Sequence, residues 1–473
     1  MLFNSIPFIF FFLPITLIGY FWLCSHRMGI GARIWLVIAS LFFYSYWNVS
    51  YLPLILVSMA FNFVVGTVLT NTHSAHKKLL LIFGILVNVL LLGYFKYTNF
   101  FIDNLNAIGG FAISAKNIAL PLAISFFTFQ QIAYLVDSYK GLTRGYNLLN
   151  YSLFVTFFPQ LIAGPIVAHH ETIPQFARIR NWVKNYRHLF FGIFLFLMGL
   201  FKKVIIADWF ATFATMGFDT MQSLTVVQAW FVSLSYTVQI YFDFSGYCDM
   251  AMGLAKMFNI DLPINFNSPY KALNIQDFWR RWHITLSRFL RDYLYIPLGG
   301  NRRGYSRALA NVFMVFLIGG LWHGAAWTFV IWGALHGLAN VVWRLWRKTN
   351  LQMKKWLAWF ITFNFVNIAW VFFRANSFAD AKKVLMSMFD CGAVFGAPNL
   401  KAFGSGTSGA LAVLIALIIG CLVLPNSVEI VKRVKITNKK SAFWWGCVLA
   451  VLAVAILVKM IVIPYSEFIY FNF

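Results

Sequence analysis

Residues 79–97 read LLLIFGILVNVLLLGYFKY, an apolar run in which Lys96 is the one charged side chain. A helix that crosses the hydrocarbon core of a bilayer needs about 20 predominantly apolar residues. Because the bilayer core holds no water, the backbone polar groups of a spanning segment must be satisfied within a helix or a closed barrel. The run lacks the alternation of apolar and polar residues that marks a barrel strand. It therefore predicts a transmembrane helix.

Similar runs recur along the chain and decide the fold class. Of the 473 residues, 60% are hydrophobic and 11% are charged, unlike water-soluble domains of average composition. We expect an all-α polytopic membrane protein with about 11–13 membrane helices, plus re-entrant and interfacial helices, in one membrane-embedded domain over residues 1–473. Pro159, Gly164 and Pro165 loosen one run, 149–168, which we expect to enter the membrane and return. The candidate spans are 3–24, 33–49, 51–70, 79–97, 118–137, 149–168, 189–207, 225–246, 306–322, 326–345, 356–373, 408–424 and 442–463.

The chain carries a formal net charge of +24, from 38 Lys and Arg against 14 Asp and Glu. In a soluble protein this excess would suggest a nucleic-acid partner. In a membrane protein it marks cytoplasmic loops and contacts with anionic lipid, so we expect the lipid bilayer, and no nucleic acid, as a partner. Placing basic loops such as 77–78 and 256–307 on the cytoplasmic side gives about twelve crossings and puts both termini outside.

Residues 276–298 read QDFWRRWHITLSRFLRDYLYIPL and are too polar for a membrane-spanning helix. The pattern predicts an amphipathic helix whose apolar stripe includes His283 and has Arg280 and Arg281 beside it. The residues that recur at helical spacing along the stripe are Trp279, His283, Leu286, Leu290 and Tyr293. One interpretation is an interfacial helix whose arginines contact lipid phosphates. The other is a site at which these side chains bind substrate.

Residues 319–327, GGLWHGAAW, place Trp322 and His323 where two apolar runs meet. Ionisable side chains at membrane depth are costly and usually face a cavity or a partner. A neutral imidazole in an apolar site can accept a proton from an attacking hydroxyl group. The pattern predicts acyl transfer to an alcohol, with His323 as the base and His283 available to orient the acyl donor or stabilise the oxyanion.

Other chemistries lack their sequence signatures. The chain has no GxSxG, P-loop, GxGxxG or HExxH motif, and its five cysteines are scattered without CxxC spacing. We therefore predict no metal site and no permanently bound cofactor. His169 and His170 adjoin Glu171 without metal-ligand spacing, and we interpret them as a solvated loop.

Three further polar residues leave two interpretations open. Asp243 and Asp249 fall in YFDFSGYCDMA, where an unpaired carboxylate would be costly. They are either structural partners of Lys or Arg residues in the following loop or they orient a catalytic histidine. His336 in WGALHGL is likewise either structural or part of a substrate site.

Two stretches carry a family resemblance, FWRRWHITLSRFLRDYLYIPLGGNRRG at 278–304 and GGLWHGAAWTFVIWGALHG at 319–337. They resemble the membrane-bound O-acyltransferase family in its bacterial polysaccharide branch, which includes alginate O-acetylation systems. Further supporting matches are LGYFKYTNFF at 92–101, LPLAISFFTFQQIAYLVDSYKG at 120–141, FPQLIAGPIV at 158–167, FKKVIIAD at 201–208 and QIYFDFSGYCDMAMGLA at 239–255.

The resemblance implies a ring of tilted helices around a central funnel, a His-containing core at about 239–345, His323 as the base and His283 as the upstream polar residue. It also implies acetyl-CoA as the donor substrate on the cytoplasmic side of the bacterial inner membrane. The implied acceptor is a cell-envelope polysaccharide such as alginate, with peptidoglycan or cellulose as alternatives. A periplasmic acetyltransferase or esterase-like partner is implied for the final transfer.

The C-terminal residues 464–473, PYSEFIYFNF, resemble an aromatic tail motif of related D-alanyl transfer systems. That resemblance makes Tyr470 a candidate acyl relay across the membrane, whereas an interfacial aromatic anchor is the structural alternative. A transporter, or a scaffold of a polymer-secretion complex, is the alternative function from another class, because intramembrane polar residues also occur there.

Overall fold

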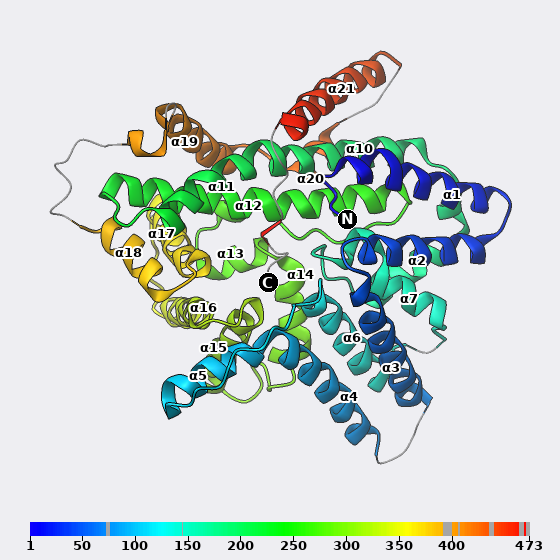
Figure 1. Cartoon of the computed structure of the whole chain (residues 1–473), viewed down its shortest axis with the longest axis horizontal. Coiled ribbons are helices and arrows are strands. Elements are labelled where there is room, and N and C mark those ends of the chain that lie inside the picture. Colours follow the sequence, from blue (N-terminus) through cyan, green and yellow to red (C-terminus); the bar gives the residue numbers. More distant parts are fainter. Residues whose placement is uncertain are drawn as a thin grey trace. The chain divides into compact units, whose positions relative to one another are not determined.

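The computed structural model describes residues 1–71, 76–143, 145–390, 400–404, 407–434, 439–462 and 468–469. Every regular element in these ranges is a helix, as Figure 1 shows. By length and composition, seven of the helices can cross a membrane, or eight if the bent pair Gly409–Val423 and Ser427–Arg433 is one span. The predicted all-α polytopic class is confirmed. The larger number of about 11–13 spans stays a prediction, as does the ring around a funnel.

The chain packs as two compact units. Unit 1 comprises the described residues of Met1–Phe196 and Met250–Pro263, and unit 2 those of Leu197–Asp249 and Ile264–Ile469. The expected core at about 239–345 lies mainly in unit 2. The single domain over residues 1–473 stays a prediction.

Unit 1 is held together by apolar packing and by a buried cluster of amides. The amide of Asn62 on α3 exchanges hydrogen bonds with that of Asn88 on α4, and it donates to Gln131 on α6 at 2.6 Å. Such interhelical hydrogen bonds between otherwise apolar helices fix which faces meet. The helices of unit 1 are η1 (Phe8–Phe12), α1 (Leu13–Ser25), α2 (Gly29–Ser45), η2 (Val49–Tyr51), α3 (Leu52–Asn71), α4 (Lys77–Leu92), η3 (Gly93–Tyr97), α5 (Thr98–Gly109), α6 (Ile124–Tyr139), α7 (Leu148–Thr156), α8 (Phe158–Leu161), α9 (His169–Ala177), η4 (Ile179–Trp182) and most of α10 (Tyr186–Phe201).

The run 149–168 is broken, as its prolines predicted. Helix α7 ends at Thr156, α8 is a single turn, and the buried segment that follows turns at residues 162–164 and has no regular structure from there to α9. The prediction of a solvated loop at 169–170 is wrong for His169, which is 1% exposed. Its Nε2 lies 2.9 Å from the Asp137 carboxylate and its Nδ1 lies 2.9 Å from the Tyr146 hydroxyl. A buried carboxylate partner from another helix is not visible in local sequence.

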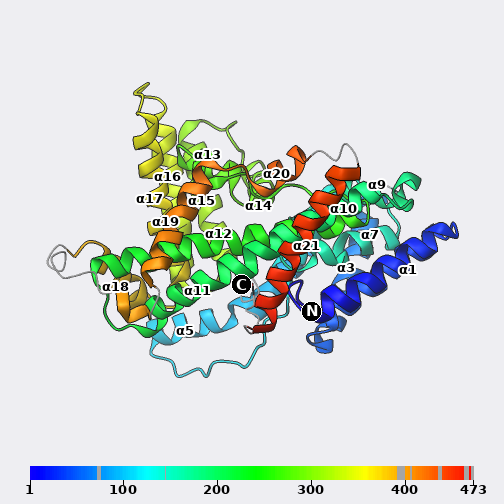
Figure 2. The same cartoon turned by 90° about the horizontal axis from the view of Figure 1, so that it is seen from above.

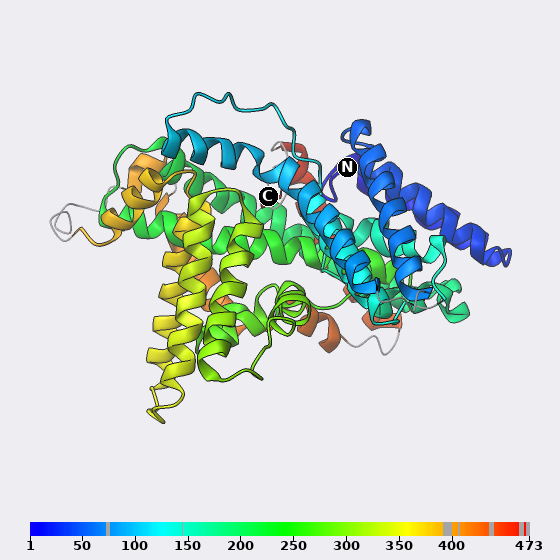
Figure 3. The same cartoon turned by 90° about the horizontal axis from the view of Figure 1, so that it is seen from below.

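Unit 2 contains most of the long helix α12 and a stack of three helices, α15 to α17, which run side by side in Figures 2 and 3. A Cβ atom on Gly320 of α15 would lie 2.4 Å from the Phe329 carbonyl oxygen and 2.9 Å from Cα of Gly333, so the glycines permit the backbones of α15 and α16 to touch. The helices of unit 2 are η5 (Lys202–Ala207), α11 (Asp208–Thr215), η6 (Met216–Thr220), most of α12 (Val226–Met257), η7 (Pro269–Lys271), α13 (Ile275–Arg281), α14 (Ile284–Leu290), η8 (Arg291–Tyr295), α15 (Tyr305–His323), α16 (Trp327–Trp346), α17 (Lys355–Arg374), α18 (Phe378–Met388), η10 (Leu400–Phe403), α19 (Thr407–Val423), α20 (Ser427–Arg433) and α21 (Lys439–Val462).

Two elements of unit 2 differ from the sequence-based boundaries. The span predicted to end at residue 246 continues as α12 to Met257, because Asp243 and Asp249 are paired with lysines inside the unit. The single amphipathic helix predicted over 276–298 is wrong. The chain forms α13 and α14 with a break between them, followed by the π-helix η8.

Candidate active site

The break between α13 and α14 falls on His283. This residue has φ +44° and ψ +53°, a left-handed conformation that costs a residue other than glycine about 1–2 kcal/mol. Asn265 holds the break: its backbone carbonyl accepts from the N–H of Ile284 at 3.0 Å. Its side-chain oxygen accepts from the backbone N–H of Thr285 at 3.1 Å and from the Thr285 hydroxyl at 2.9 Å. The strained backbone is thus fixed by one buried asparagine.

The same asparagine sets the tautomer of His283. The Oδ1 atom of Asn265 lies 3.2 Å from Nδ1 of His283. Because the backbone N–H of Thr285 can only donate, the asparagine atom that it meets must be the oxygen. An amide oxygen accepts, so Nδ1 carries the proton and Nε2 carries the lone pair.

His283 is fully buried, and its ring meets the Phe244 ring edge-on at 4.8 Å. It lies between α13 and α14, outside the candidate spans. Burial lowers the pKa of this imidazole from 6.5 to about 3, because a charged ring would lose its hydration. His283 is therefore neutral at physiological pH.

His323 ends α15, and its ring lies 6.5 Å from that of His283, so the structure brings the two predicted histidines together. The rings of Trp322, Trp332 and Phe373 surround it at 4.9, 5.2 and 5.2 Å between centroids. The following Gly324 lets the Phe329 ring approach closely, since an added Cβ would lie 2.1 Å from that ring. Aromatic rings therefore pack against the imidazole on several sides.

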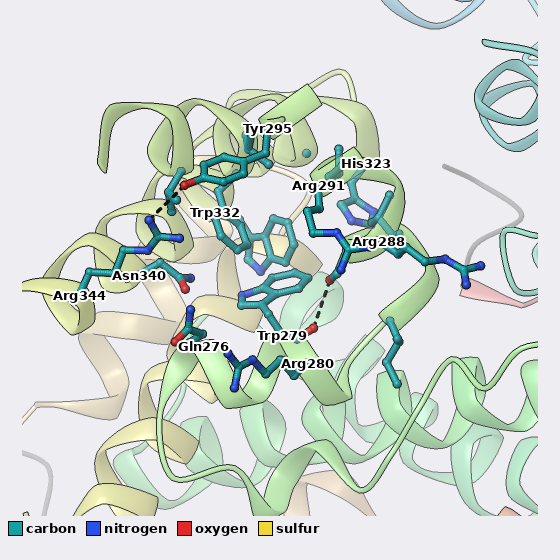
Figure 4. Close-up of a pocket in the computed structure, with 18 of the residues that line it drawn as sticks. Gln276, Trp279, Arg280, Arg288, Arg291, Tyr295, His323, Trp332, Asn340 and Arg344 are labelled. Carbon is teal, nitrogen blue, oxygen red and sulfur yellow. Dashed lines mark hydrogen bonds between the residues drawn. The ribbon is translucent and has the colours of Figure 1, made fainter. Parts of the chain in front are cut away.

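His323 lines a cavity of about 540 Å³ in unit 2, which Figure 4 shows. Trp279 and Trp332 form part of its wall next to the histidine. Arg344 is held by the Tyr295 hydroxyl at 3.3 Å. The lining also includes Gln276, Asn340 and the arginines Arg280, Arg288, Arg291 and Arg344. The cavity thus combines a buried imidazole, apolar rings and four guanidinium groups.

Other predicted residues take structural positions. His336 is fully buried, and its Nδ1 accepts from the indole N–H of Trp279 at 3.2 Å. It therefore holds Trp279, a wall of the cavity, in place. Arg281 pairs with Asp277 at 3.0 Å, one helical turn away, and does not line the cavity.

The two acidic residues of α12 are buried ion pairs. Asp243 binds Lys203 at 2.5 Å and Asp249 binds Lys202 at 2.6 Å. Both lysines come from the π-helix η5, which precedes α12. The prediction that Lys or Arg residues of the following loop pair with these aspartates is therefore wrong, because both lysines precede α12 in the chain. A role in orienting a histidine stays a prediction that none of these contacts supports.

The predictions for Tyr470 and for metal binding concern features other than this cavity. Tyr470 lies outside the described residues. Among the residues that are described, no group of three or more His, Cys, Asp or Glu side chains could hold a metal ion. Sequence reasoning missed Asn265, Trp332, Asn340 and Arg344. Asn265 stands 18 positions before His283, a separation that no helix or strand period marks.

A buried histidine on the wall of an arginine-lined cavity, in a polytopic helical protein, is an arrangement suited to acyl transfer from an anionic donor within a membrane. The chain belongs to the membrane-bound O-acyltransferase family, whose model matches residues 5–379. It is therefore a membrane-embedded O-acyltransferase.

Relatives within this family share most of the chain. It is 55% identical over 419 residues to the peptidoglycan O-acetyltransferase of Helicobacter pylori, covering 82% of this chain and 80% of that protein. It is 42% identical over 402 residues to the probable alginate O-acetylase AlgI of Pseudomonas aeruginosa, covering 83% and 75%. A more distant relative is the teichoic acid D-alanyltransferase of Bacillus subtilis, 29% identical over 280 residues, covering 55% and 70%.

Proposed function

We propose that this acyltransferase takes acetyl from acetyl-CoA on the cytoplasmic side of the bacterial inner membrane and delivers it for O-acetylation of a cell-envelope polysaccharide. The observation that carries the proposal is the cavity that His323 and four arginines line together. A thioester is apolar at its reacting end and polyanionic at its coenzyme end. The cavity offers rings and imidazole for the first and guanidinium groups for the second.

The arginines of the cavity suit the phosphate groups of an acetyl-CoA donor. Guanidinium groups bind phosphate oxygens through paired, charge-assisted hydrogen bonds. Arg344 is preorganised for this role, because Tyr295 binds its guanidinium at 3.3 Å and Tyr295 is itself bound to Asn301. A second small pocket, which Arg344 also lines, adds Arg347 and Lys348. This continuous basic surface fits the diphosphate and ribose phosphate of a coenzyme A donor.

In the proposed chemistry, His323 acts as the general base. It accepts the proton of the acceptor hydroxyl as that oxygen attacks the thioester carbonyl carbon. The carbon–sulfur bond then breaks, and the proton passes to the departing thiolate, so the products are an O-acetyl ester and a free thiol. His283, with its lone pair on Nε2, supports this imidazole from 6.5 Å away between ring centroids.

The acceptor is proposed from the relatives. The higher identity to the peptidoglycan enzyme, 55% against 42% for the alginate enzyme, favours peptidoglycan over alginate. Cellulose has no support of this kind. A cytoplasmic thioester and an external polymer do not meet directly, so we include a relay through Tyr470 and a periplasmic acetyltransferase partner. Both termini are placed outside in this proposal.

Substituting His323 by Ala tests the function. In membranes given labelled acetyl-CoA, the variant should transfer at least about 1,000-fold less acetyl, the upper part of the range for removing a general base. His170→Ala is the matched control, because His170 is exposed on α9 in unit 1. A transporter or scaffold would tolerate His323→Ala. Polymer acetylation at the control level, in a variant that folds and inserts normally, would refute the proposal.

A further inference from the structure

The last described residues of the chain are bound to a buried ion pair in unit 2. The backbone N–H of Ile469 donates to Oδ2 of Asp243 at 3.0 Å, while Oδ1 of the same carboxylate binds Lys203 at 2.5 Å. Phe468 is 1% exposed. Its ring meets the Tyr247 ring edge-on at 4.5 Å, and the Lys203 ammonium lies 4.8 Å from its centroid. One carboxylate, one ammonium and one phenol ring thus contact the tail together.

We propose that Lys203, Asp243 and Tyr247 form a docking seat for residues 468–469, and that this tail seat positions the next residue, Tyr470, for acylation. The positioning role rests on the relay in the proposed function, whereas the docking itself does not. The seat gives both oxygens of this buried aspartate a partner, and buried charges need partners that offset their desolvation.

The carboxylate is the only side-chain group of its size that serves both contacts. Each oxygen of Asp243 accepts one bond, from the lysine on one side and from the tail backbone on the other. An asparagine has a single carbonyl oxygen, and the lysine charge attracts that oxygen. The amide NH₂ would then face the N–H of Ile469, so two donors would meet and the tail would be released.

The ammonium group of Lys203 keeps a carboxylate partner after the Asp243→Asn substitution, so the substitution does not leave a buried lysine unpaired. Lys203 also binds Asp208 at 2.8 Å, so it keeps a negative partner in an Asp243→Asn chain. The adjacent pair offers a matched control. Lys202 and Asp249 join the same two helices, η5 and α12, and the partners that the structure gives Asp249 are Lys202 and Ser427. Asp249→Asn therefore perturbs a similar buried pair without touching residues 468–469.

A fluorine probe reports docking. The full-length chain in lipid nanodiscs would carry 4-fluorophenylalanine at position 468, and a soluble gadolinium chelate would broaden its signal only where the ring is exposed. We expect a shielded signal in the wild type and in Asp249→Asn. Asp243→Asn should lower the ratio of shielded to broadened signal about 10- to 100-fold, the effect of losing a hydrogen bond to a charged group. Asp243→Glu, which keeps both oxygens, should restore part of the shielded signal.

Acetylation of the tail, followed by intact mass after mixing with acetyl-CoA, reports positioning. Asp243→Asn should lower the maximal rate about tenfold or more and leave the donor KM unchanged, because the donor binds at the arginine-lined cavity. A shielded signal in Asp243→Asn, or equal release in Asp249→Asn, would overturn the seat. Release with an unchanged rate would overturn the positioning role. A wild-type tail that docks but never gains acetyl would refute the relay and leave the docking intact.

Discussion

Asn265 is the residue whose removal tests the site most directly. Its side-chain oxygen accepts from Nδ1 of His283 and twice from Thr285, at 3.2, 3.1 and 2.9 Å. Each of these bonds contributes about 1 kcal/mol net, and a buried N–H left without its acceptor costs about 1–3 kcal/mol. Asn265→Ala should therefore lower the free energy of unfolding by about 3 kcal/mol. It should also free His283 from its left-handed conformation, and acetyl transfer should fall about 100-fold.

The assay pairs thermal unfolding in detergent with transfer of labelled acetyl from acetyl-CoA. Asn311→Ala is the control for stability alone. Asn311 is 3% exposed and donates to the carbonyls of Leu298 and Gly300, so its loss should lower the unfolding temperature similarly and spare transfer. Equal transfer rates in Asn265→Ala and Asn311→Ala would refute the argument that Asn265 sets the geometry of the catalytic histidines.

Three further outcomes are expected. Asn265→Asp keeps all three acceptor contacts but places a negative charge beside His283, which raises the pKa of the imidazole. Acetyl transfer by this variant should therefore fall as the pH decreases from 7 to 5. A pH profile identical to that of the wild type would contradict this expectation. In the wild type, burial lowers the pKa of His283 from 6.5 to about 3, so the unfolded chain takes up the proton at a higher pH than the folded chain. The free energy of unfolding should therefore decrease as the pH falls from 6.5 toward 3. His283→Gln should make this decrease smaller, as measured by calorimetry. Arg344→Gln should raise the KM for acetyl-CoA about tenfold with little change in kcat. Arg187→Gln in unit 1 is the control variant. An unchanged KM in Arg344→Gln would mean that the donor phosphates bind elsewhere.

Sequence predicted what depends on composition and on short motifs. Long apolar runs gave the all-helical class, and the small residues beside His323 marked the place where α15 and α16 meet. The break at His283 was missed, because its cause is Asn265, which is distant in the chain and contributes nothing to the local helical period. Arg344 was missed for a related reason. It stands near the end of an apolar helix, where a basic residue is ordinary, and only the packing of α15 and α16 turns it toward the cavity.

The two histidines show how a membrane site divides its tasks. His323 lines the cavity, and aromatic rings of α16 and α17 pack against it. His283 lies behind it, with a backbone strain that Asn265 holds in place and with a proton assigned to Nδ1 by the same oxygen. Within the described residues, the aspartates of α12 bind lysines and the tail instead of either histidine. An imidazole base suits an activated thioester donor, because a thiolate is a good leaving group and needs less help from the base.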